Sequence, residues 1–416
     1  MSDIPLTLEG FSMPAAHSFS SAELPDFVQS RITGHAVGRI QQRWAGEHLL
    51  RGALPDSTAL HLSSNDYLCL ANERQLIEAH AGAVMATQHQ LLMSATFLHG
   101  DTPTARLEQR LAQFMRAPDS ILCQSGWAAN VGLLQAIADQ HTPVYLDIHA
   151  HMSLWQGAHA AHARAIAFAH NDATHAERQI KKHGRGVIAV DAVYSTNGSR
   201  CPLADFADVA QRNDCVLVVD ESHSLGTHGP HGAGLVAEQN LMRNVHFQTA
   251  SLAKAFAGRA GLITCASHFK DYFAMESYPA VFSSCLLNHE LTWFEQVADF
   301  ITLADDRRLK LRAVTRQVRT ALMQLGYDTS AGTEQIIALQ SGRELLTLGL
   351  RDALQARGIF GSVFCAPATG LHRSLIRLSM NSGLSEMDVE RLIDVCAQIR
   401  DEVRLDQWKR PRSADP

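Results

Sequence analysis

The sequence contains no apolar run of membrane-spanning length, and its first residues lack a basic start followed by an apolar block. Neither a membrane anchor nor a signal peptide is therefore expected. The eight cysteines stand singly, with no CxxC pair, which is typical of reduced and mostly buried thiols. A formal net charge of -6 offers no basic surface for nucleic acid or an anionic membrane. These absences predict a cytoplasmic protein.

Two familiar ligand motifs are also missing. There is no HExxH sequence, although six histidines crowd one region and make a metal site the competing interpretation there: His149, His151, His159, His162, His170 and His175. No acidic residue at ligand spacing completes such a site, so no metal is expected. The glycines of GTHGPHGAG follow DESHS instead of opening a helix directly after a strand, which favours a loop over the site rather than a dinucleotide-binding turn.

The length and the hydrophobic content of the chain are those of a large enzyme. The chain has 416 residues, 46% of them hydrophobic, which suffices for a large core and a second, smaller domain. The predicted organisation is a disordered tail over 1–22, an N-terminal arm over 23–60, a large domain over 61–290, a small C-terminal domain over 291–405 and a disordered tail over 406–416.

Between about residues 100 and 270, short β-branched runs alternate with helical stretches. The runs are SILCQ, PVYLDI, GVIAVDAV, CVLVVDE, VHFQTAS and GLITCAS. This alternation predicts an α/β fold with a mainly parallel sheet and helices on both faces. Ligands of such sheets lie beyond the carboxyl ends of the strands, where Asp147, Asp191 and Asp220 fall. Further on, a helix is predicted from about His289 to Leu325, followed by strands at QIIALQ, SVFCAP and LIRLSMN.

The most informative segment runs from residue 216 to 261. It places Asp220 at the end of an apolar strand, His223 three residues on, and Lys254 after a second strand. Pyridoxal 5′-phosphate (PLP) needs a carboxylate beside its ring nitrogen and a primary amine for its aldehyde, and a polar group such as His223 can reach its ring hydroxyl. Taken singly, these residues could be a helix cap, a core histidine and a surface lysine, but their joint position favours a PLP site.

Two neighbouring segments point to the same ligand. In CQSGWAAN a strand meets a helix, so Ser125, Gly126 and the amide of Trp127 lie at a helix N-terminus that suits a phosphate. An ordinary strand-to-helix turn is the alternative interpretation. His151 follows another strand, where its imidazole could stack on the cofactor ring.

Taken together, these segments resemble the α-oxoamine synthases, and in particular their quorum-sensing autoinducer branch. LPDF, SNDYL, QSGWAANVGLLQ, AHMSLW, VDESHSLGTHGP, TASLAKAFAGRAG, VFSS, FGSVFCAPAT and IRLS carry the resemblance, which covers the chain from Leu24 to about Ile399. It implies a fold-type I PLP-dependent transferase, with a mainly parallel seven-stranded sheet in a large domain and a smaller C-terminal α/β domain. It also implies a homodimer with its active site at the subunit interface.

The resemblance assigns roles to individual residues. Lys254 would hold the cofactor aldehyde, Asp220 the ring nitrogen and His223 the ring hydroxyl, with His151 stacked on the ring. Further contacts would come from Ser251 and Ser195, and from Ser283 and Ser284 of the neighbouring subunit. Arg377 and Asn65 would bind the substrate carboxylate, and Asp191 stands where many relatives have Glu.

The chain departs from its relatives at one loop. Where the biotin- and haem-pathway enzymes have a glycine-rich loop, this chain reads LLMSATFLHGD. We expect Met93, Phe97 and Leu98, with Phe360 and Phe364, to line an apolar tunnel for an acyl chain, each buried methylene contributing about 0.8 kcal/mol. Plain core packing is the alternative for each residue.

The implied reaction joins a small L-amino acid, such as 2-aminobutyrate or S-adenosylmethionine, to a medium- or long-chain acyl-CoA. Coenzyme A and carbon dioxide leave, and the product is an α-aminoketone precursor of an α-hydroxyketone autoinducer. Three alternatives remain: a biosynthetic synthase of the 8-amino-7-oxononanoate or 5-aminolevulinate type, a non-catalytic partner subunit that should have lost Lys254, and a nicotinamide oxidoreductase that should have an early GxGxxG.

Overall fold

A computed structural model describes residues 22–87 and 92–408. The chain forms two compact units that divide between Leu49 and Leu50. The tails predicted at 1–22 and 406–416 lie outside the described residues except for Ala22 and residues 406–408. At that last point Trp408 packs its ring edge-on against Tyr327, with ring centroids 5.6 Å apart.

The N-terminal unit is helical in its described part. Helix α1 (Asp26–Gly34) begins after Pro25 and runs directly into a π-helix (His35–Arg43). These two elements form the first part of the N-terminal arm predicted over 23–60. Trp44 ends the helical segment, and the guanidinium of Arg39 lies over its ring at 5.0 Å from the centroid.

The second unit is built on a seven-stranded sheet with the strand order β2-β8-β7-β6-β5-β3-β4. Only β8 runs antiparallel to its neighbours, so the sheet is mainly parallel and the predicted fold class is confirmed. The strands are β2 (Asp119–Cys123), β3 (Pro143–Asp147), β4 (Arg164–Phe168), β5 (Val187–Asp191), β6 (Val216–Asp220), β7 (Phe247–Ser251) and β8 (Gly261–Cys265).

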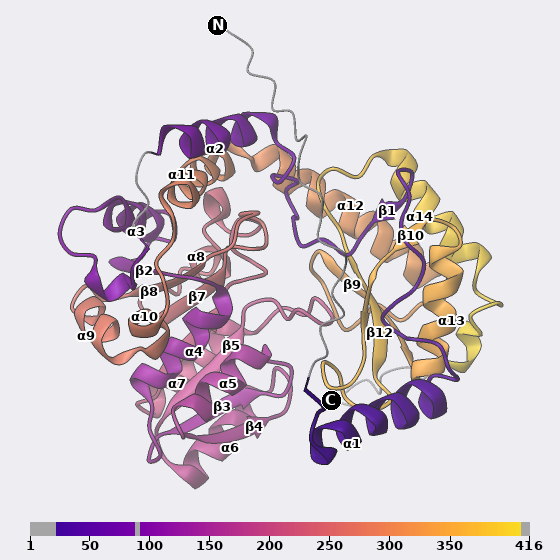
Figure 1. Ribbon diagram of the computed structural model, residues 1–416, viewed down its shortest axis with the longest axis horizontal. Coiled ribbons are helices and arrows are strands. Elements are labelled where there is room, and N and C mark those ends of the chain that lie inside the picture. Colours follow the sequence, from indigo (N-terminus) through magenta and orange to yellow (C-terminus); the bar gives the residue numbers. More distant parts are fainter. Residues whose placement is uncertain (1–21, 88–91, 409–416) are drawn as a thin grey trace, which may run out of the picture. The chain divides into compact units, whose positions relative to one another are not determined.

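Helices cover both faces of this sheet because successive strand residues alternate between two apolar layers. Val144, Leu146 and Val218 belong to the core under α4 (Gly126–Ile137) and α5 (Met152–Ala160). Tyr145 and Leu217 belong to the core under α6 (Ala173–His183) and α7 (Leu203–Arg212). Figure 1 shows these helices wrapped around the strands.

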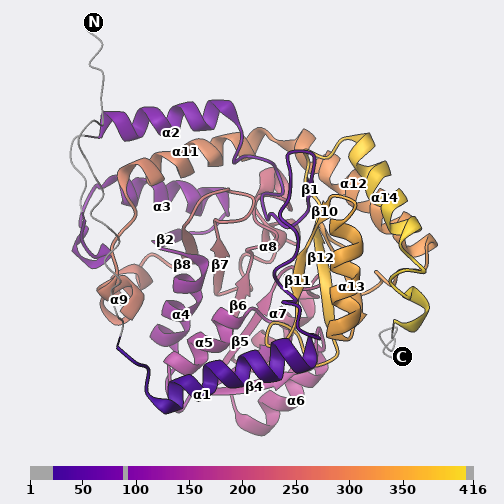
Figure 2. The same ribbon diagram turned by 45° about the vertical axis from the view of Figure 1, so that its right-hand side comes forward.

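The C-terminal part has its own three-stranded antiparallel sheet, ordered β11-β12-β9. Its elements are β9 (Ile336–Gly342), α13 (Glu344–Gln355), β11 (Ser362–Phe364), β12 (Ser374–Ser379) and α14 (Glu386–Gln398). The three predicted strands are therefore present, and Figure 2 shows α13 beside them. The single helix predicted from His289 to Leu325 is instead two, α11 (Asn288–Leu303) and α12 (Asp305–Gln324), because the backbone leaves the helical conformation at Ala304.

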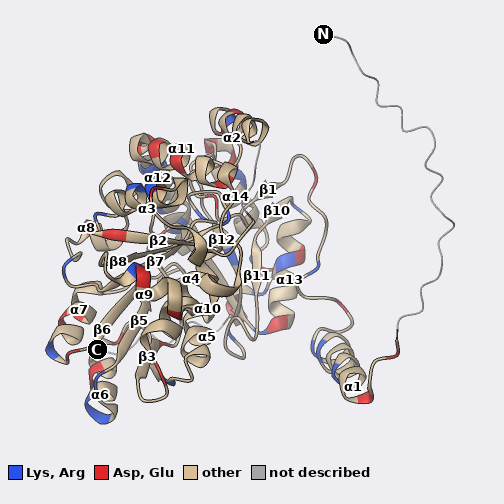
Figure 3. Cartoon of the chain, turned by 60° about the vertical axis from the view of Figure 1, so that its left-hand side comes forward, with Lys and Arg blue, Asp and Glu red and all other residues tan. Residues whose placement is uncertain are grey.

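The remaining elements are short or peripheral. They are β1 (Leu60–His61), which pairs with β10 (Ile359–Phe360), and the helices α2 (Arg74–Ala86), η2 (Ala95–Phe97), α3 (Pro103–Phe114), η3 (Pro230–Gly232), α8 (Leu235–Glu238), α9 (Phe269–Glu276), α10 (Tyr278–Phe282) and η4 (Leu405–Gln407). Figure 3 shows acidic and basic residues interspersed along surface helices such as α6 and α13. Within the described ranges, no helix combines the length and apolarity that crossing a membrane requires.

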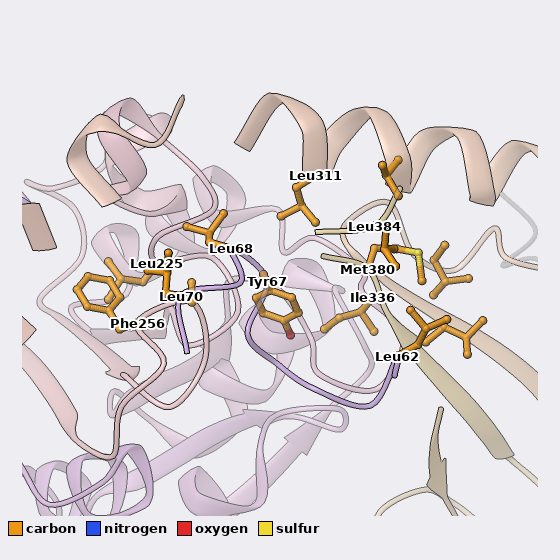
Figure 4. Packing of buried hydrophobic residues seen from close by; sticks show 14 of the residues in the cluster. Leu62, Tyr67, Leu68, Leu70, Leu225, Phe256, Leu311, Ile336, Met380 and Leu384 are labelled. Carbon is orange, nitrogen blue, oxygen red and sulfur yellow. The ribbon is translucent and has the colours of Figure 1, made fainter. Parts of the chain in front are cut away.

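One apolar core joins the large sheet region to the C-terminal part. Tyr67 is fully buried in it, and Figure 4 shows its ring with Ile336 beside it. Leu225 and Phe256 join this core from the large-sheet side, and Met380 joins it from the C-terminal side. This shared core fixes the position of the C-terminal part relative to the large-sheet region. The candidate functional site lies where these two regions meet.

The glycine-rich loop after β6 folds around Glu221. The backbone amides of Leu235 and Val236 donate to its carboxylate at 2.9 and 2.6 Å, and the Ser224 hydroxyl donates to it as well. Gly234 has φ +98°, and a Cβ there would lie 2.8 Å from this carboxylate. The loop thus packs on Glu221 and lies outside the linings of the two site cavities described below.

We expect Glu221→Ala to lower the free energy of unfolding by about 2–3 kcal/mol, because two buried amides would lose their acceptor. Urea denaturation measures this, with Glu276→Ala on exposed helix α9 as the control that should change stability by less than about 0.5 kcal/mol. Equal stabilities for the two variants would contradict the role given to Glu221.

Candidate functional site

Two adjoining cavities open at the carboxyl ends of the parallel strands. The inner cavity, of about 210 Å³, brings together eight of the predicted residues: Ser125, Gly126, Trp127, His151, Asp220, His223, Ser251 and Lys254. The outer cavity, of about 550 Å³, shares His151, His223 and Lys254 with it. Parallel strands that end at one edge explain why residues so far apart in the sequence converge here.

Asp220 is held at the floor of the inner cavity. Its Oδ2 accepts a hydrogen bond from Asn130 Nδ2 at 2.7 Å, and its Oδ1 accepts from the Ser222 amide at 2.8 Å. Asn130 is itself fixed, because it also donates to Ser153 Oγ at 2.8 Å and accepts from Thr249 Oγ1 at 2.6 Å. The carboxylate therefore has one orientation. Sequence reasoning missed Asn130, which lies inside a helix.

A second buried carboxylate, Asp191, is the register partner of Asp220 on the neighbouring strand. Burial, and then the negative charge of Asp220, raise the pKa of Asp191 well above its usual value. Its Oδ1 accepts from the His151 amide at 3.1 Å. Burial beside Asp220 therefore disfavours the charged form of Asp191.

The N-terminus of α4 also lines this cavity. Ser125 caps this helix by accepting from the Ala128 amide at 3.1 Å, while the amides of Gly126 and Trp127 have no carbonyl acceptor within the helix. A Cβ at position 126 would lie 2.5 Å from Ser251 Cβ, so only glycine allows this close approach. The two amides point to an anion site.

His151 stands beside this wall. Its ring lies edge-on to Trp127, with centroids 6.2 Å apart and an interplanar angle of 82°. Its Nδ1 is 2.7 Å from Ser153 Oγ, which fixes the ring. Burial lowers the pKa of His151, so the ring is a neutral surface at pH 7.

A chain of hydrogen bonds links His223 to Arg377. The Tyr67 hydroxyl is 2.6 Å from His223 Nδ1 and donates to Asn65 Oδ1 at 3.3 Å. Arg377 donates from Nη2 to the same Asn65 oxygen and from Nη1 to the Ser195 carbonyl, each at 3.0 Å. Tyr67 was missed by sequence reasoning although it stands in SNDYL, because no spacing rule places its hydroxyl against a histidine 156 positions away.

Lys254 faces both cavities. Burial, and then the positive charge of Arg377, lower the pKa of its amine to about 8, although Asp220 acts in the opposite direction. Roughly a tenth of the amine is therefore neutral at pH 7, far more than for an ordinary lysine. A neutral amine is the form that attacks a carbonyl or accepts a proton.

The other predicted residues are more dispersed. Asn65, Ser195, Phe364 and Arg377 line the outer cavity. Phe360 is buried in β10 with its ring stacked on His61 at 6.0 Å, outside both linings. Four more residues also lie outside the linings: Met93, Phe97, Ser283 and Ser284. The Ser284 carbonyl accepts from Gln124 Nε2 at 2.9 Å, and Phe97 is 64% exposed.

The histidine-rich region forms a hydrogen-bonded cluster. His170 Nδ1 is 2.9 Å from Asp147 Oδ1, and the Tyr194 hydroxyl donates to the other oxygen of Asp147 at 2.9 Å. The His149 ring lies 4.2 Å from that of His170. Across residues 22–87 and 92–408, no three His, Cys, Asp or Glu side chains are grouped so that they could hold a metal ion.

The chain resembles known proteins in both sequence and fold. Residues 57–395 match the model of the family described as aminotransferase class I and II. The CAI-1 autoinducer synthase of Vibrio campbellii is 43% identical over 90% of this chain and 95% of that protein. A putative 8-amino-7-oxononanoate synthase of Glaesserella parasuis is 28% identical over 81% of this chain and 90% of its own length. A serine palmitoyltransferase structure from S. paucimobilis, with a PLP–myriocin aldimine bound, superposes with a TM-score of 0.81 at 18% identity, covering 91% of this chain and 98% of that one.

We expect the Lys254 amine to become reactive with a midpoint near pH 8 in protein free of bound aldehyde. Competitive acetylation with acetic anhydride, followed by mass spectrometry at a series of pH values, measures this midpoint. Lys310, exposed on α12, serves as the reference for the reagent. A midpoint for Lys254 above pH 10 would contradict the effect of burial and Arg377.

Proposed function

Because the chain belongs to the class I and II aminotransferase family, and within it to the α-oxoamine synthases, we propose that it is a PLP-dependent acyltransferase that condenses an L-amino acid with an acyl-CoA. The observation that carries this proposal is the inner cavity. It presents an amine of lowered pKa, a fixed carboxylate and a helix N-terminus to one enclosed space.

The residues present fit PLP in each of its parts. The amides of Gly126 and Trp127, with the nearby hydroxyl of Ser251, would hold the phosphate. Asp220 would keep a proton on the ring nitrogen, and the Asn130 hydrogen bond keeps that carboxylate aimed. His151 would cover one face of the ring, and His223, positioned by Tyr67, would reach the ring hydroxyl.

When bound, PLP supplies an electron sink for negative charge developing at the substrate α-carbon. The protein supplies the proton transfers. Lys254 takes the α-proton, and the α-carbon then forms a bond to the acyl carbon while the bond to the coenzyme A sulfur breaks. Carbon dioxide leaves from the α-carbon, and the Lys254 ammonium returns a proton to it.

Arg377 would bind the carboxylate of the amino acid. Its guanidinium is buried, and its Nε has no hydrogen-bond partner among the described residues, whereas Nη1 and Nη2 are occupied by Ser195 and Asn65. A carboxylate would give that nitrogen its partner, which an arginine fork suits. The Phe364 ring lies under the guanidinium at 4.8 Å and limits its movement.

We further propose that the acyl group is medium or long and the donor a small amino acid such as 2-aminobutyrate, or S-adenosylmethionine. The product would be an α-aminoketone precursor of an α-hydroxyketone autoinducer. The ring of Phe364 in the lining of the outer cavity and the 43% identity to a CAI-1 autoinducer synthase support this choice. We place the reaction in the cytoplasm, where acyl-CoA thioesters are made.

The active enzyme is proposed to be a homodimer. Ser283 and Ser284 lie outside the inner cavity of their own chain and would complete the phosphate site of the other subunit. Trp127 at 48% exposed and Phe282 at 77% exposed give this region the apolar surface that a subunit interface buries.

Incubating the PLP-loaded protein with decanoyl-CoA and a panel of amino acids should release coenzyme A and give an α-aminoketone of the expected mass. Lys254→Ala should abolish release. Arg377→Lys should raise the donor KM by about tenfold, because a lysine ammonium cannot replace the Nε donor while keeping the bonds to Asn65 and Ser195. Release with pimeloyl-CoA or succinyl-CoA but not with decanoyl-CoA would contradict the autoinducer proposal and favour a biosynthetic synthase.

Mixing two inactive variants tests the shared site. One subunit carries Lys254→Ala, and the other carries Ser283→Ala with Ser284→Ala. In a heterodimer, the lysine of the second subunit meets intact serines from the first, so part of the activity should return. Serines acting within their own chain predict no recovery, and that result would contradict the proposed interface.

A further inference from the structure

Four polar side chains form a continuous hydrogen-bonded relay across the site. Arg377 donates from Nη2 to Asn65 Oδ1 at 3.0 Å, the hydroxyl of the fully buried Tyr67 lies 3.3 Å from the same oxygen, and that hydroxyl lies 2.6 Å from His223 Nδ1. Arg377 would bind the donor carboxylate, and His223 would reach the ring hydroxyl of the cofactor. The relay therefore connects the places of two ligands, and Tyr67 is its central member.

The heavier atoms at both ends of the relay are held in place. The carbonyl of the buried His223 accepts from Gln335 Nε2 at 2.7 Å. Arg377 donates from Nη1 to the Ser195 carbonyl at 3.0 Å, and the Phe364 ring lies 4.8 Å from its guanidinium carbon. Movement of whole side chains is thereby restricted, whereas a proton can still change its position within the hydrogen bonds.

The two central groups are both uncharged near neutral pH. Burial raises the pKa of the Tyr67 hydroxyl, which therefore keeps its proton. Burial, and then the positive charges of Lys254, Arg377 and His151, lower the pKa of His223 well below its usual value. A neutral imidazole has a single N–H, and the partner of one ring nitrogen decides which nitrogen carries it.

The single proton of the Tyr67 hydroxyl has two acceptors within reach. If Tyr67 donates to Asn65, then His223 carries its own proton on Nδ1 and donates it to the Tyr67 oxygen, so Nε2 is an acceptor. If Tyr67 donates to His223 instead, Nε2 carries the proton and is a donor. His223 lines both cavities, and Nε2 is the ring nitrogen that Tyr67 leaves available to a ligand.

The charge of Arg377 influences which acceptor Tyr67 uses. Asn65 Oδ1 already accepts from the guanidinium, whose positive charge draws electron density from this oxygen and makes it a weaker acceptor for Tyr67. The guanidinium Nε has no hydrogen-bond partner among the described residues. A carboxylate bound there would offset the positive charge and strengthen Asn65 as the acceptor for Tyr67.

We propose that Tyr67 is a positioning residue that couples the carboxylate site at Arg377 to the ring hydroxyl of the cofactor, by turning its hydroxyl proton from His223 Nδ1 to Asn65 Oδ1. The inference rests on the proposed function, because it needs a carboxylate at Arg377 and PLP beside His223. Without the carboxylate, Nε2 donates and favours a deprotonated ring oxygen. With it, Nε2 accepts and favours the protonated ring hydroxyl. Tyr67 and His223 keep their proton counts, and the ring oxygen takes its proton from water.

The test follows the visible absorbance band of the PLP-loaded protein over a range of pH values, with and without propionate. Propionate has a carboxylate but no amine, so it can occupy Arg377 and cannot react with the cofactor aldehyde. The rise in melting temperature with propionate concentration shows where binding saturates. Propionate should raise the pH midpoint of the band in the unaltered protein by about 0.7 pH unit or more beyond its rise in Tyr67→Phe, which corresponds to a fivefold coupling.

Three variants separate the relay from other effects. Tyr67→Phe keeps the direct effect of the propionate charge on the cofactor and removes only the relay. Asn65→Ala interrupts the relay at a partly buried residue, so it should reduce the shift in the same way even if Tyr67→Phe does not fold. Tyr327→Phe is the matched control and should keep the full shift, because it also loses a buried hydroxyl, bonded to the Cys396 carbonyl at 2.8 Å, but lies outside both cavity linings.

The possible results distinguish the relay from the proposed function. A titration curve that propionate leaves unchanged in the unaltered protein, or an equal shift in Tyr67→Phe, overturns the relay alone. A shift that is reduced in Tyr327→Phe as well would assign the effect to a general loss of packing and overturn it too. A purified protein without the visible band holds no PLP, and propionate that stabilises Arg377→Lys as much as the unaltered protein is not bound at Arg377. In either of these cases the proposed function fails, and the relay fails with it.

Discussion

The site depends on one buried cation, the guanidinium of Arg377. It ties together three segments that are distant in the sequence, because it binds Asn65 before Tyr67, the carbonyl of Ser195 after β5, and the ring of Phe364. A buried charge is tolerated only where it is partnered, so these contacts hold the C-terminal part against the large sheet. The nitrogen left without a partner makes the same residue a receptor for a carboxylate.

The charges around that cation depend on one another. Arg377 lowers the pKa of Lys254 and contributes to the low pKa of His223, whereas Asp220 raises the pKa of Asp191. The result is a site with the Arg377 cation at one end, buried carboxyl groups at the strand ends, and an amine and imidazoles of lowered pKa. Such an arrangement brings the pKa of Lys254 to about 8, close to the pH range in which a general base works best.

The sequence could predict those contacts that follow from the geometry of a parallel sheet. Asp220, His223 and Lys254 meet because parallel strands end at one edge, and this follows from strand patterns alone. Asn130 and Tyr67 could not be found in that way, since their partners are set by tertiary packing. Strand β4 was missed because it is an edge strand whose residues, apart from Phe168, are not buried, so it lacks a continuous apolar pattern.

Different structural elements line the two cavities. This difference determines which cavity can tolerate substitutions that alter substrate preference. Strand ends and the N-terminus of α4 form the inner cavity, and a shift of one residue in β6 would turn Asp220 to the other face of the sheet. The loop between β11 and β12, with Thr369 and Arg373, forms much of the outer wall, and loops accept substitution far more easily. We therefore expect substrate preference to change through that loop, while the chemistry at Lys254 and Asp220 stays the same.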